Sequence, residues 1–443
     1  MKKILIFGAG RSSSSLIKYL LNLLESENWF LTVIDSDLKT AQCKVGNHPK
    51  SACFAIDASD RSVRMKFIKD ADIVISMLPA FLHIKILRDA IDCGVHVITP
   101  SYVTEDIKSL DQEAKSKDVI ILNEMGLDPG IDHMSAKKLI DDIKTRGGKL
   151  IGFESFTGGL VAPESDSNPW NYKFTWNPRN VVLAGQGGAA KFIQESKYKY
   201  IPYNKLFRRT ELIEIDGYGK FEGYANRDSL KYRSVYDLEN IPTMFRGTLR
   251  KIGFCRAWNV FVQLGLTDDS YVIEGSEQMT NREFINSFLG YNQSDSVELK
   301  FRHYLGIEQD DYIWEKFVWL GIFEDKKIGI KNATPAQMLQ KILEDKWSLR
   351  SEDKDMIVMW HKFNFTLKGK SHEIRSHMVY IGKDDQYTAM SDTVGIPVGI
   401  AAKMILKKQL NRRGVLLPIY DEIYIPVLNE LEQYGISFTE KEI

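Results

Sequence analysis

The stretch KKILIFGAGRSSSSLIKYL (Lys2–Leu20) joins a short apolar run to a segment of helical periodicity through a glycine-rich turn. A short apolar run that ends in glycine predicts a buried β-strand. Gly8 would permit the tight turn, and Gly10 would let a pyrophosphate approach the backbone at the start of the helix. Ser13 replaces the third glycine of the dinucleotide fingerprint, so the turn taken alone could be an ordinary strand-to-helix connection.

The segment FLTVIDSD (Phe30–Asp37) predicts a second strand that ends in a carboxylate, as in dinucleotide-binding folds. Asp35 there would bind the adenosine ribose diol and repel a 2′-phosphate, which predicts NAD more than NADP as the cofactor. Alternatively, Asp37 contacts the ribose and Asp35 caps the turn. Three further residues that follow predicted strands are expected to line the cofactor site: Asp57, Leu78 and Pro79.

Strand and helix patterns alternate through the first third of the chain, which predicts a parallel sheet covered on both faces. The expected fold class is α/β, with an N-terminal Rossmann doubly wound parallel sheet, a second α+β domain with a mixed sheet, and a small helical insertion. The expected bounds are 1–125 for the Rossmann domain, 126–280 and 351–387 for the α+β domain, and 281–350 for the helical domain. C-terminal helices within 388–443 are expected to pack back on the first two domains.

The composition is that of a globular protein, with 44% apolar and 27% charged residues. The 59 basic and 59 acidic residues balance, so global charge gives no reason to expect a nucleic-acid or anionic-membrane partner. No long uninterrupted apolar run is evident, and no membrane association is expected. The four cysteines form no C-x-x-C pair and the histidines show no ligand spacing, so we expect no metal site and a cytoplasmic protein.

Several motifs occur in an order typical of one family: MLPAFLH, TPSYVT, NEMGLDPGIDHM, YANRDS and RGTLR. Together they resemble the saccharopine reductase family, the glutamate-forming saccharopine dehydrogenases, and the resemblance covers nearly the whole chain. It implies a homodimer and an NAD(P)-dependent enzyme acting on a CH–NH donor. Saccharopine would be oxidised to an imine, which water splits into L-glutamate and 2-aminoadipate 6-semialdehyde, or the reverse.

The resemblance also assigns residues. The cofactor loop corresponds to Ala9, Gly10, Arg11 and Ser12, and Trp176 to a position beside the nicotinamide. The saccharopine contacts correspond to Ser101, Tyr102, Asp128, Arg227, Thr248, Leu249 and Arg250. Two positions depart from many relatives: Thr157 replaces a cysteine, and Ile34-Asp35 stands where fungal NADP-dependent relatives carry Cys-Arg, which also favours NAD.

Saccharopine carries three carboxylates, so fixed arginines are expected in its site. Arg227 and Arg250 are the preferred candidates, and Lys173 and Arg246 are open ones. Asp128 and Tyr102 are the expected catalytic residues, because a carboxylate near the secondary amine would stabilise an iminium cation.

Asp128 could instead be the N-cap of a helix over 131–143, with Pro129 at its first position. The histidines His83 and His133 are expected to be structural.

Two other functions are compatible with a Rossmann domain. One is a related C–N dehydrogenase of the carboxynorspermidine or homospermidine type, and the other is a dinucleotide-binding regulator without catalysis. A polyamine substrate would require acidic side chains, whereas YANRDS and RGTLR offer arginines. The physiological direction of the reaction is not encoded in these motifs.

Overall fold

The computed structural model describes residues 1–443, which form two compact units. The first unit contains residues 1–150, 365–372 and 378–443, and the second contains residues 151–364 and 373–377. The first unit therefore combines the N-terminal third of the chain with its C-terminal segment.

A seven-stranded parallel sheet forms the centre of the first unit, in the order β15-β6-β5-β4-β1-β2-β3. Its strands are β1 (Lys2–Phe7), β2 (Trp29–Asp35), β3 (Ser51–Ala55), β4 (Ile73–Ser76), β5 (His96–Ile98), β6 (Ile120–Leu122) and β15 (Gly414–Leu416). The strand order reverses beside β1, between β1 and β4, which is where dinucleotides bind in such folds. The predicted doubly wound α/β fold is confirmed.

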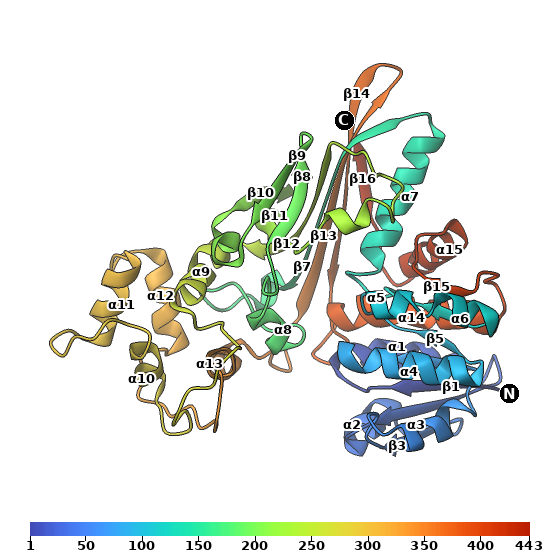
Figure 1. Ribbon diagram of the computed structural model, residues 1–443, viewed down its shortest axis with the longest axis horizontal. Helices are drawn as coiled ribbons and strands as arrows, with labels where there is room; N and C mark the ends of the chain where they lie inside the picture. Colours follow the sequence, from blue (N-terminus) through green and yellow to red (C-terminus); the bar gives the residue numbers. More distant parts are fainter. The chain divides into compact units, whose positions relative to one another are not determined.

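Helices cover both faces of this sheet (Figure 1). They are α1 (Ser14–Leu21), α2 (Leu38–Val45), α3 (Arg61–Ile68), α4 (Ala80–Cys93), α5 (Glu105–Lys108), α6 (Asp111–Ser116) and α14 (Ala389–Leu406). The helices α7 (Ile131–Thr145) and α15 (Asp421–Glu432) pack against each other, and α15 also packs on α14. The central strands are buried on both sides, which explains their continuous apolar sequences: all four residues of β4 are buried.

Helix α14 packs directly against α1. A Cβ atom on Gly395 would lie 2.7 Å from the backbone nitrogen of Leu16, and one on Gly399 would lie 2.5 Å from the ring of Tyr19. By length and hydropathy alone α14 could cross a membrane, but 78% of it is buried inside the protein. Its small residues therefore serve close helix packing. Strand β15, at the edge of the sheet, was not anticipated from the sequence.

The second sheet is mixed, with the order β10-β11-β12-β7-β13-β14-β16, and β8 pairs with β12 and β9. The strands are β7 (Lys149–Val161), β8 (Ala190–Gln194), β9 (Lys197–Ile201), β10 (Thr210–Ile215), β11 (Gly219–Ala225), β12 (Thr243–Lys251), β13 (Asp355–Leu367), β14 (Lys370–Ile381) and β16 (Thr439–Glu442). Strand β12 runs parallel to β7 and antiparallel to β11. The predicted mixed sheet is thus present.

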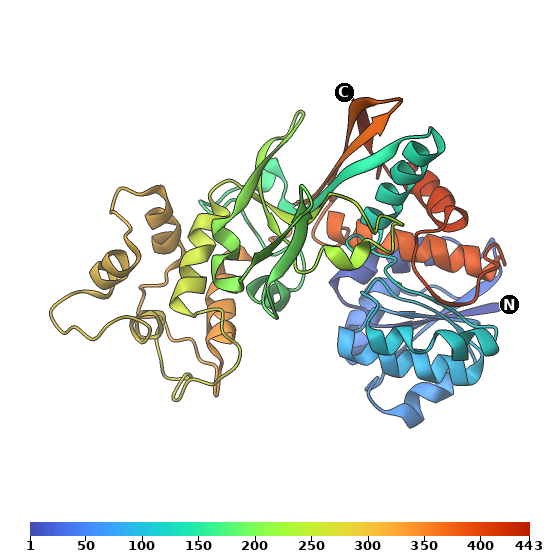
Figure 2. The ribbon, with the colours of Figure 1, turned by 45° about the horizontal axis from the view of Figure 1, so that its top comes forward.

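The helices of the second unit are α8 (Pro178–Val182), α9 (Phe254–Leu264), α10 (Asn281–Asn286), α11 (Val297–Leu305), α12 (Tyr312–Leu320) and α13 (Pro335–Trp347). Figure 2 shows α10–α13 grouped next to α9. A buried aromatic cluster holds this end together: the ring of Trp170 lies 5.7 Å from Phe261 and 5.1 Å from Trp347. The helical insertion expected over 281–350 contains α10–α13.

Candidate functional site

The glycine-rich turn after β1 has the geometry of a phosphate-binding loop. Gly8 has a φ of +99°, and a Cβ there would lie 2.8 Å from the carbonyl oxygen of Met77, so only glycine fits. A Cβ on Gly10 would meet nothing within 4 Å, so there is open space above the loop. No side chain caps the short helix Arg11–Ser13 that follows. The uncapped helix start and the space above it fit a pyrophosphate.

The carboxylate of Asp35 is hydrogen-bonded to the backbone around this loop. One carboxylate oxygen of Asp35 accepts the Ala9 N–H at 2.6 Å, and the other accepts the Asp37 N–H at 3.0 Å. Asp37 is the N-cap of α2 and accepts the Lys39 N–H. Asp37 therefore has the capping role that was considered for Asp35, and Asp35 instead stabilises the glycine-rich loop.

The other expected cofactor residues of the first unit lie at the carboxyl edge of its sheet. Asp57 follows β3 and is exposed, and Ser59 donates to it from its N–H and its hydroxyl, which lowers the pKa of Asp57. Leu78 and Pro79 follow β4, with Pro79 at the start of α4. Arg11 and Ser12 lie in the short helix that follows the glycine-rich turn, and the Arg11 side chain is exposed.

A hydrogen-bonded chain of buried side chains reaches Ser101. Nδ1 of His83 lies 2.8 Å from the hydroxyl of Ser76, and Nε2 of His83 lies 2.7 Å from the hydroxyl of Ser101. Burial lowers the pKa of His83 to about 4, so the imidazole is neutral at pH 7. His83 is thus the structural histidine that the sequence predicts, and its hydrogen bond holds Ser101, a predicted substrate contact, in place.

Tyr102 and Asp128 are brought together. The phenol of Tyr102 donates to Oδ1 of Asp128 at 2.9 Å, although the two residues follow different strands, β5 and β6. The alternative role of Asp128 as a helix cap is wrong, because α7 begins at Ile131 with Gly130 as its N-cap. The N–H of Ile131 bonds to the carbonyl of Gly126, so a tight turn separates Asp128 from the helix.

The further charged groups of this turn form a buried cluster of their own. Nε2 of His133 lies 2.7 Å from Oε2 of Glu124, and both side chains are fully buried. Oε1 of Glu124 accepts the N–H of Val103, and the N–H of Glu124 donates to the carbonyl of Ser101. Asp132 accepts the N–H of Gly130. This cluster fixes the loop that carries Ser101 and Tyr102.

In the second unit, Arg250 is a buried cation without a carboxylate partner. Its side chain is only 4% exposed, and its Nη1 donates to the Leu249 carbonyl at 2.8 Å. Its guanidinium carbon lies 5.2 Å from the ring centre of Tyr172 and 5.4 Å from that of Phe254. No hydrogen bond of good geometry reaches Nε of Arg250 or the hydroxyl of Tyr172. A buried charge left in this state calls for an anionic ligand.

Neighbouring strands add hydroxyl groups around Arg250. Thr248 and Arg250 share one face of β12, because side chains alternate along a strand. Thr248 is paired with Thr157 on β7, whose buried hydroxyl also has no hydrogen-bond partner. The same alternation places the Leu249 side chain on the opposite face. The structure therefore does not bring the Leu249 side chain to Arg250, and only its carbonyl contacts the guanidinium.

The remaining predicted residues of the second unit have distinct surroundings. Arg227 is exposed, has a positive φ of 36° and pairs with no carboxylate, so its guanidinium group is available to a ligand. Trp176 is 36% exposed. Lys173 pairs with Asp353 at 2.6 Å in the interior, and the guanidinium of Arg246 lies over the ring of Tyr232. Lys173 therefore serves an internal ion pair.

Sequence reasoning missed two residues of the site. His83 lies in MLPAFLH without any ligand-like spacing, so only the fold reveals its contact with Ser101. Tyr172 lies in a loop of little periodicity, and no local signal marks it as the neighbour of Arg250. In the described chain, no group of three or more His, Cys, Asp or Glu side chains is arranged to hold a metal ion.

Two protein families match consecutive parts of the chain. Residues 4–122 match the saccharopine dehydrogenase NADP binding domain, and residues 126–436 match the saccharopine dehydrogenase C-terminal domain. The saccharopine dehydrogenase [NADP(+), L-glutamate-forming] of Saccharomyces cerevisiae is 32% identical over 100% of this chain and 99% of its own length. The mitochondrial alpha-aminoadipic semialdehyde synthase of Mus musculus is 30% identical, and this chain covers 47% of it.

These matches overturn the expected cofactor. The prediction of NAD over NADP is wrong, because the N-terminal match is to an NADP binding domain and three fungal relatives are named NADP+ enzymes. The physical reason lies in Asp35, whose carboxylate accepts backbone N–H groups of its own loop. The inference from Asp35 assumed a carboxylate directed at the ribose.

Solved structures agree with the family matches. The apo saccharopine dehydrogenase (L-Glu forming) of Saccharomyces cerevisiae superposes with a TM-score of 0.90 at 31% identity, covering 100% of both chains. A homospermidine synthase of Legionella pneumophila, with a TM-score of 0.56 at 10% identity, shares the fold. The chain belongs to the saccharopine dehydrogenase (L-glutamate-forming) family of oxidoreductases.

Proposed function

We propose that this protein catalyses the NADP-dependent oxidative cleavage of saccharopine to L-glutamate and 2-aminoadipate 6-semialdehyde, or the reverse reaction. The observation that supports this most directly is Arg250, a buried guanidinium with no carboxylate of its own, in a chain of this family. A substrate with three carboxylates supplies the missing anion. A polyamine would bring further positive charge to the same place and would be repelled.

Each substrate-facing group has a task in this reaction. Arg250, with the hydroxyls of Tyr172 and Thr248 nearby, would bind one carboxylate through a forked contact. Arg227 is available for a second carboxylate. The cofactor, when bound, accepts a hydride from the carbon attached to the secondary amine, which leaves an imine in the substrate. Water then adds to that carbon, and the C–N bond breaks to release the amine of glutamate and the aldehyde.

The Tyr102–Asp128 pair would handle charge and protons during these steps. A carboxylate next to the substrate nitrogen stabilises the positive charge that develops there as the hydride departs. Tyr102, donating to Oδ1 of Asp128, keeps that carboxylate oriented and can relay a proton during hydrolysis. Ser101, held by His83, would fix the substrate beside them.

Changing Asp128 to Asn is expected to lower kcat for saccharopine oxidation about 100-fold, because the iminium loses its counter-charge. The rate is followed by the absorbance of the reduced cofactor. The melting temperature should stay near that of the parent protein, since Asp128 caps no helix. Asp142→Asn is the matched control: it makes the same change at an exposed position of α7, where Asp142 lies 3.6 Å from Arg146, and its kcat should be nearly unchanged. Equal kcat losses in both variants would contradict the assigned role.

We further propose that Arg11 contacts the 2′-phosphate of NADP. Arg11 follows the open space at Gly10, is exposed, and pairs with no carboxylate. Arg11→Ala is expected to raise KM for NADP about tenfold while leaving KM for NAD little changed, because only NADP carries the extra phosphate. Initial rates with each cofactor would measure this difference. Equal increases for both cofactors would place Arg11 at a group that they share.

The cytoplasmic location and the homodimer implied by the family also remain proposals. Sedimentation velocity of the purified protein measures its oligomeric state directly. A species of twice the chain mass of 50.8 kDa is the expected result.

A further inference from the structure

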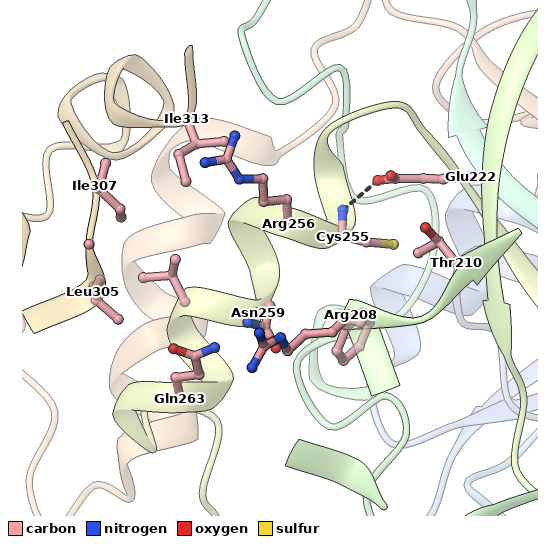
Figure 3. Close-up of a pocket in the computed structure, with 13 residues that line it drawn as sticks. Arg208, Thr210, Glu222, Cys255, Arg256, Asn259, Gln263, Leu305, Ile307 and Ile313 are labelled. Carbon is pink, nitrogen blue, oxygen red and sulfur yellow. Dashed lines mark hydrogen bonds between the residues drawn. The ribbon is translucent and has the colours of Figure 1, made fainter. Parts of the chain in front are cut away.

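A second cavity in the second unit lies apart from the cluster around Arg250. It has a volume of about 400 Å³ and is lined by one face of α9 and by residues near the ends of α11 and α12 (Figure 3). Phe207, Arg208, Thr210 and Glu222 on β11 complete the lining. The face of α9 consists of Cys255, Arg256, Asn259, Val260 and Gln263, which the helical repeat places on one side. A volume of this size lies within the range of small-molecule sites.

Three polar groups of this cavity lack the partners that their burial or charge calls for. Oδ1 of Asn259 is buried, in a side chain only 7% exposed, and accepts no hydrogen bond. Arg208 lines the cavity and pairs with no carboxylate, and Figure 3 shows it extending towards α9. Glu222 accepts the N–H of Cys255 at 2.5 Å and pairs with no cation. Arg256, by contrast, already pairs with Asp311.

Arg208 and Glu222 therefore offer one cation and one anion that are not paired with each other. A ligand matching both carries an anionic and a cationic group, as a free amino acid does with its carboxylate and its ammonium group. The unfilled acceptor on Asn259 suits an additional N–H donor of that ammonium group. The opposite wall is apolar, since Leu305, Ile307 and Ile313 line it. It would accommodate an aliphatic side chain.

We propose that this cavity binds a free α-amino acid with an aliphatic side chain. The carboxylate contacts Arg208, the ammonium group contacts Glu222 and Asn259, and the side chain packs on the wall formed by α11 and α12. The site is separate from the saccharopine site, although the two are linked by structure. Glu222 lies opposite Arg250 in the β11–β12 pairing and holds the first turn of α9, whose Phe254 packs on Arg250.

Isothermal titration calorimetry of the full-length protein with L-leucine tests the proposal. One binding event is expected, and Arg208→Gln should weaken it about tenfold or more, because an ionic hydrogen bond is lost. Arg208 is exposed, so this variant should fold normally. Leucinamide, which lacks the carboxylate, and 4-methylpentanoate, which lacks the amine, should both bind at least tenfold more weakly than L-leucine.

Three results would overturn the proposal. The first is no binding of L-leucine up to roughly 20 mM. The second is unchanged affinity in Arg208→Gln or with either analogue. The third is loss of leucine binding in Arg250→Gln with retention in Arg208→Gln, which would place the amino acid in the saccharopine site. Saccharopine turnover is not used as a readout here, so a failure of the proposed reaction would not produce any of these results.

Discussion

Arg250→Gln is expected to raise KM for saccharopine about 100-fold, with a smaller effect on kcat. Removing one partner of a buried, hydrogen-bonded charge pair costs 2 kcal/mol or more, and about 2.7 kcal/mol corresponds to 100-fold in binding. The guanidinium is 4% exposed and ringed by Tyr172, Tyr224 and Phe254, so bulk water cannot replace the lost contact. Steady-state kinetics with varied saccharopine at saturating NADP would measure the change.

Stability separates this binding role from a structural one. In the protein without substrate, the charge of Arg250 is buried without a carboxylate, which costs free energy. Arg250→Gln should therefore melt at the same temperature as the parent protein or higher. Arg250→Lys is the matched variant, since it keeps the charge but not the fork, and its KM should fall between the other two. A large drop in melting temperature with an unchanged KM would refute the assignment.

Stability of the protein is expected to fall as the pH is lowered from about 6.5 towards 4 because of His83. Burial lowers the pKa of His83 to about 4 from its usual 6.5, so in this range the unfolded chain binds a proton that the folded protein excludes. The folded state is therefore favoured fully above pH 6.5 and loses its advantage as the pH falls. The shift corresponds to about 3 kcal/mol of unfolding free energy.

Denaturant unfolding at a series of pH values would measure this dependence. His83→Gln removes the titrating group while keeping a side chain able to bond to Ser101, and its stability should vary less between pH 6.5 and 4. Some dependence will remain, because burial also lowers the pKa of His96. His303, exposed on α11, is the control position for a His→Gln change. Parallel curves for His83→Gln and the parent protein would show that His83 does not contribute.

The sequence predicted the fold where periodicity is strong. The strands of the first sheet are short apolar runs separated by helical patterns, and both signals are local. Strand β15 was missed because Gly414–Leu416 is only three residues long, and its pairing with β6 depends on residues almost 300 positions away. The start of α7 was predicted at Ile131, where it lies, but its cap was misassigned because Asp128-Pro129 imitates a helix cap, whereas the turn is closed by backbone hydrogen bonds of Gly126.

The residues of the candidate site could likewise be predicted only where the information is local in the sequence. Gly8 and Gly10 were recognisable because a turn constrains its own residues. The cofactor inference failed because the direction of a carboxylate is not local information: Asp35 is oriented by the N–H groups of Ala9 and Asp37. The isolation of Arg250 could not be read from RGTLR, since it depends on which side chains surround it in three dimensions.

The packing of α14 against α1 has a consequence for biosynthesis. The helix that follows the glycine-rich loop is covered by residues 389–406, and β15 adds the edge strand only at residues 414–416. During translation the N-terminal portion leaves the ribosome long before these segments exist. Its apolar helix face therefore stays without its partner helix until residues 389–406 have been synthesised.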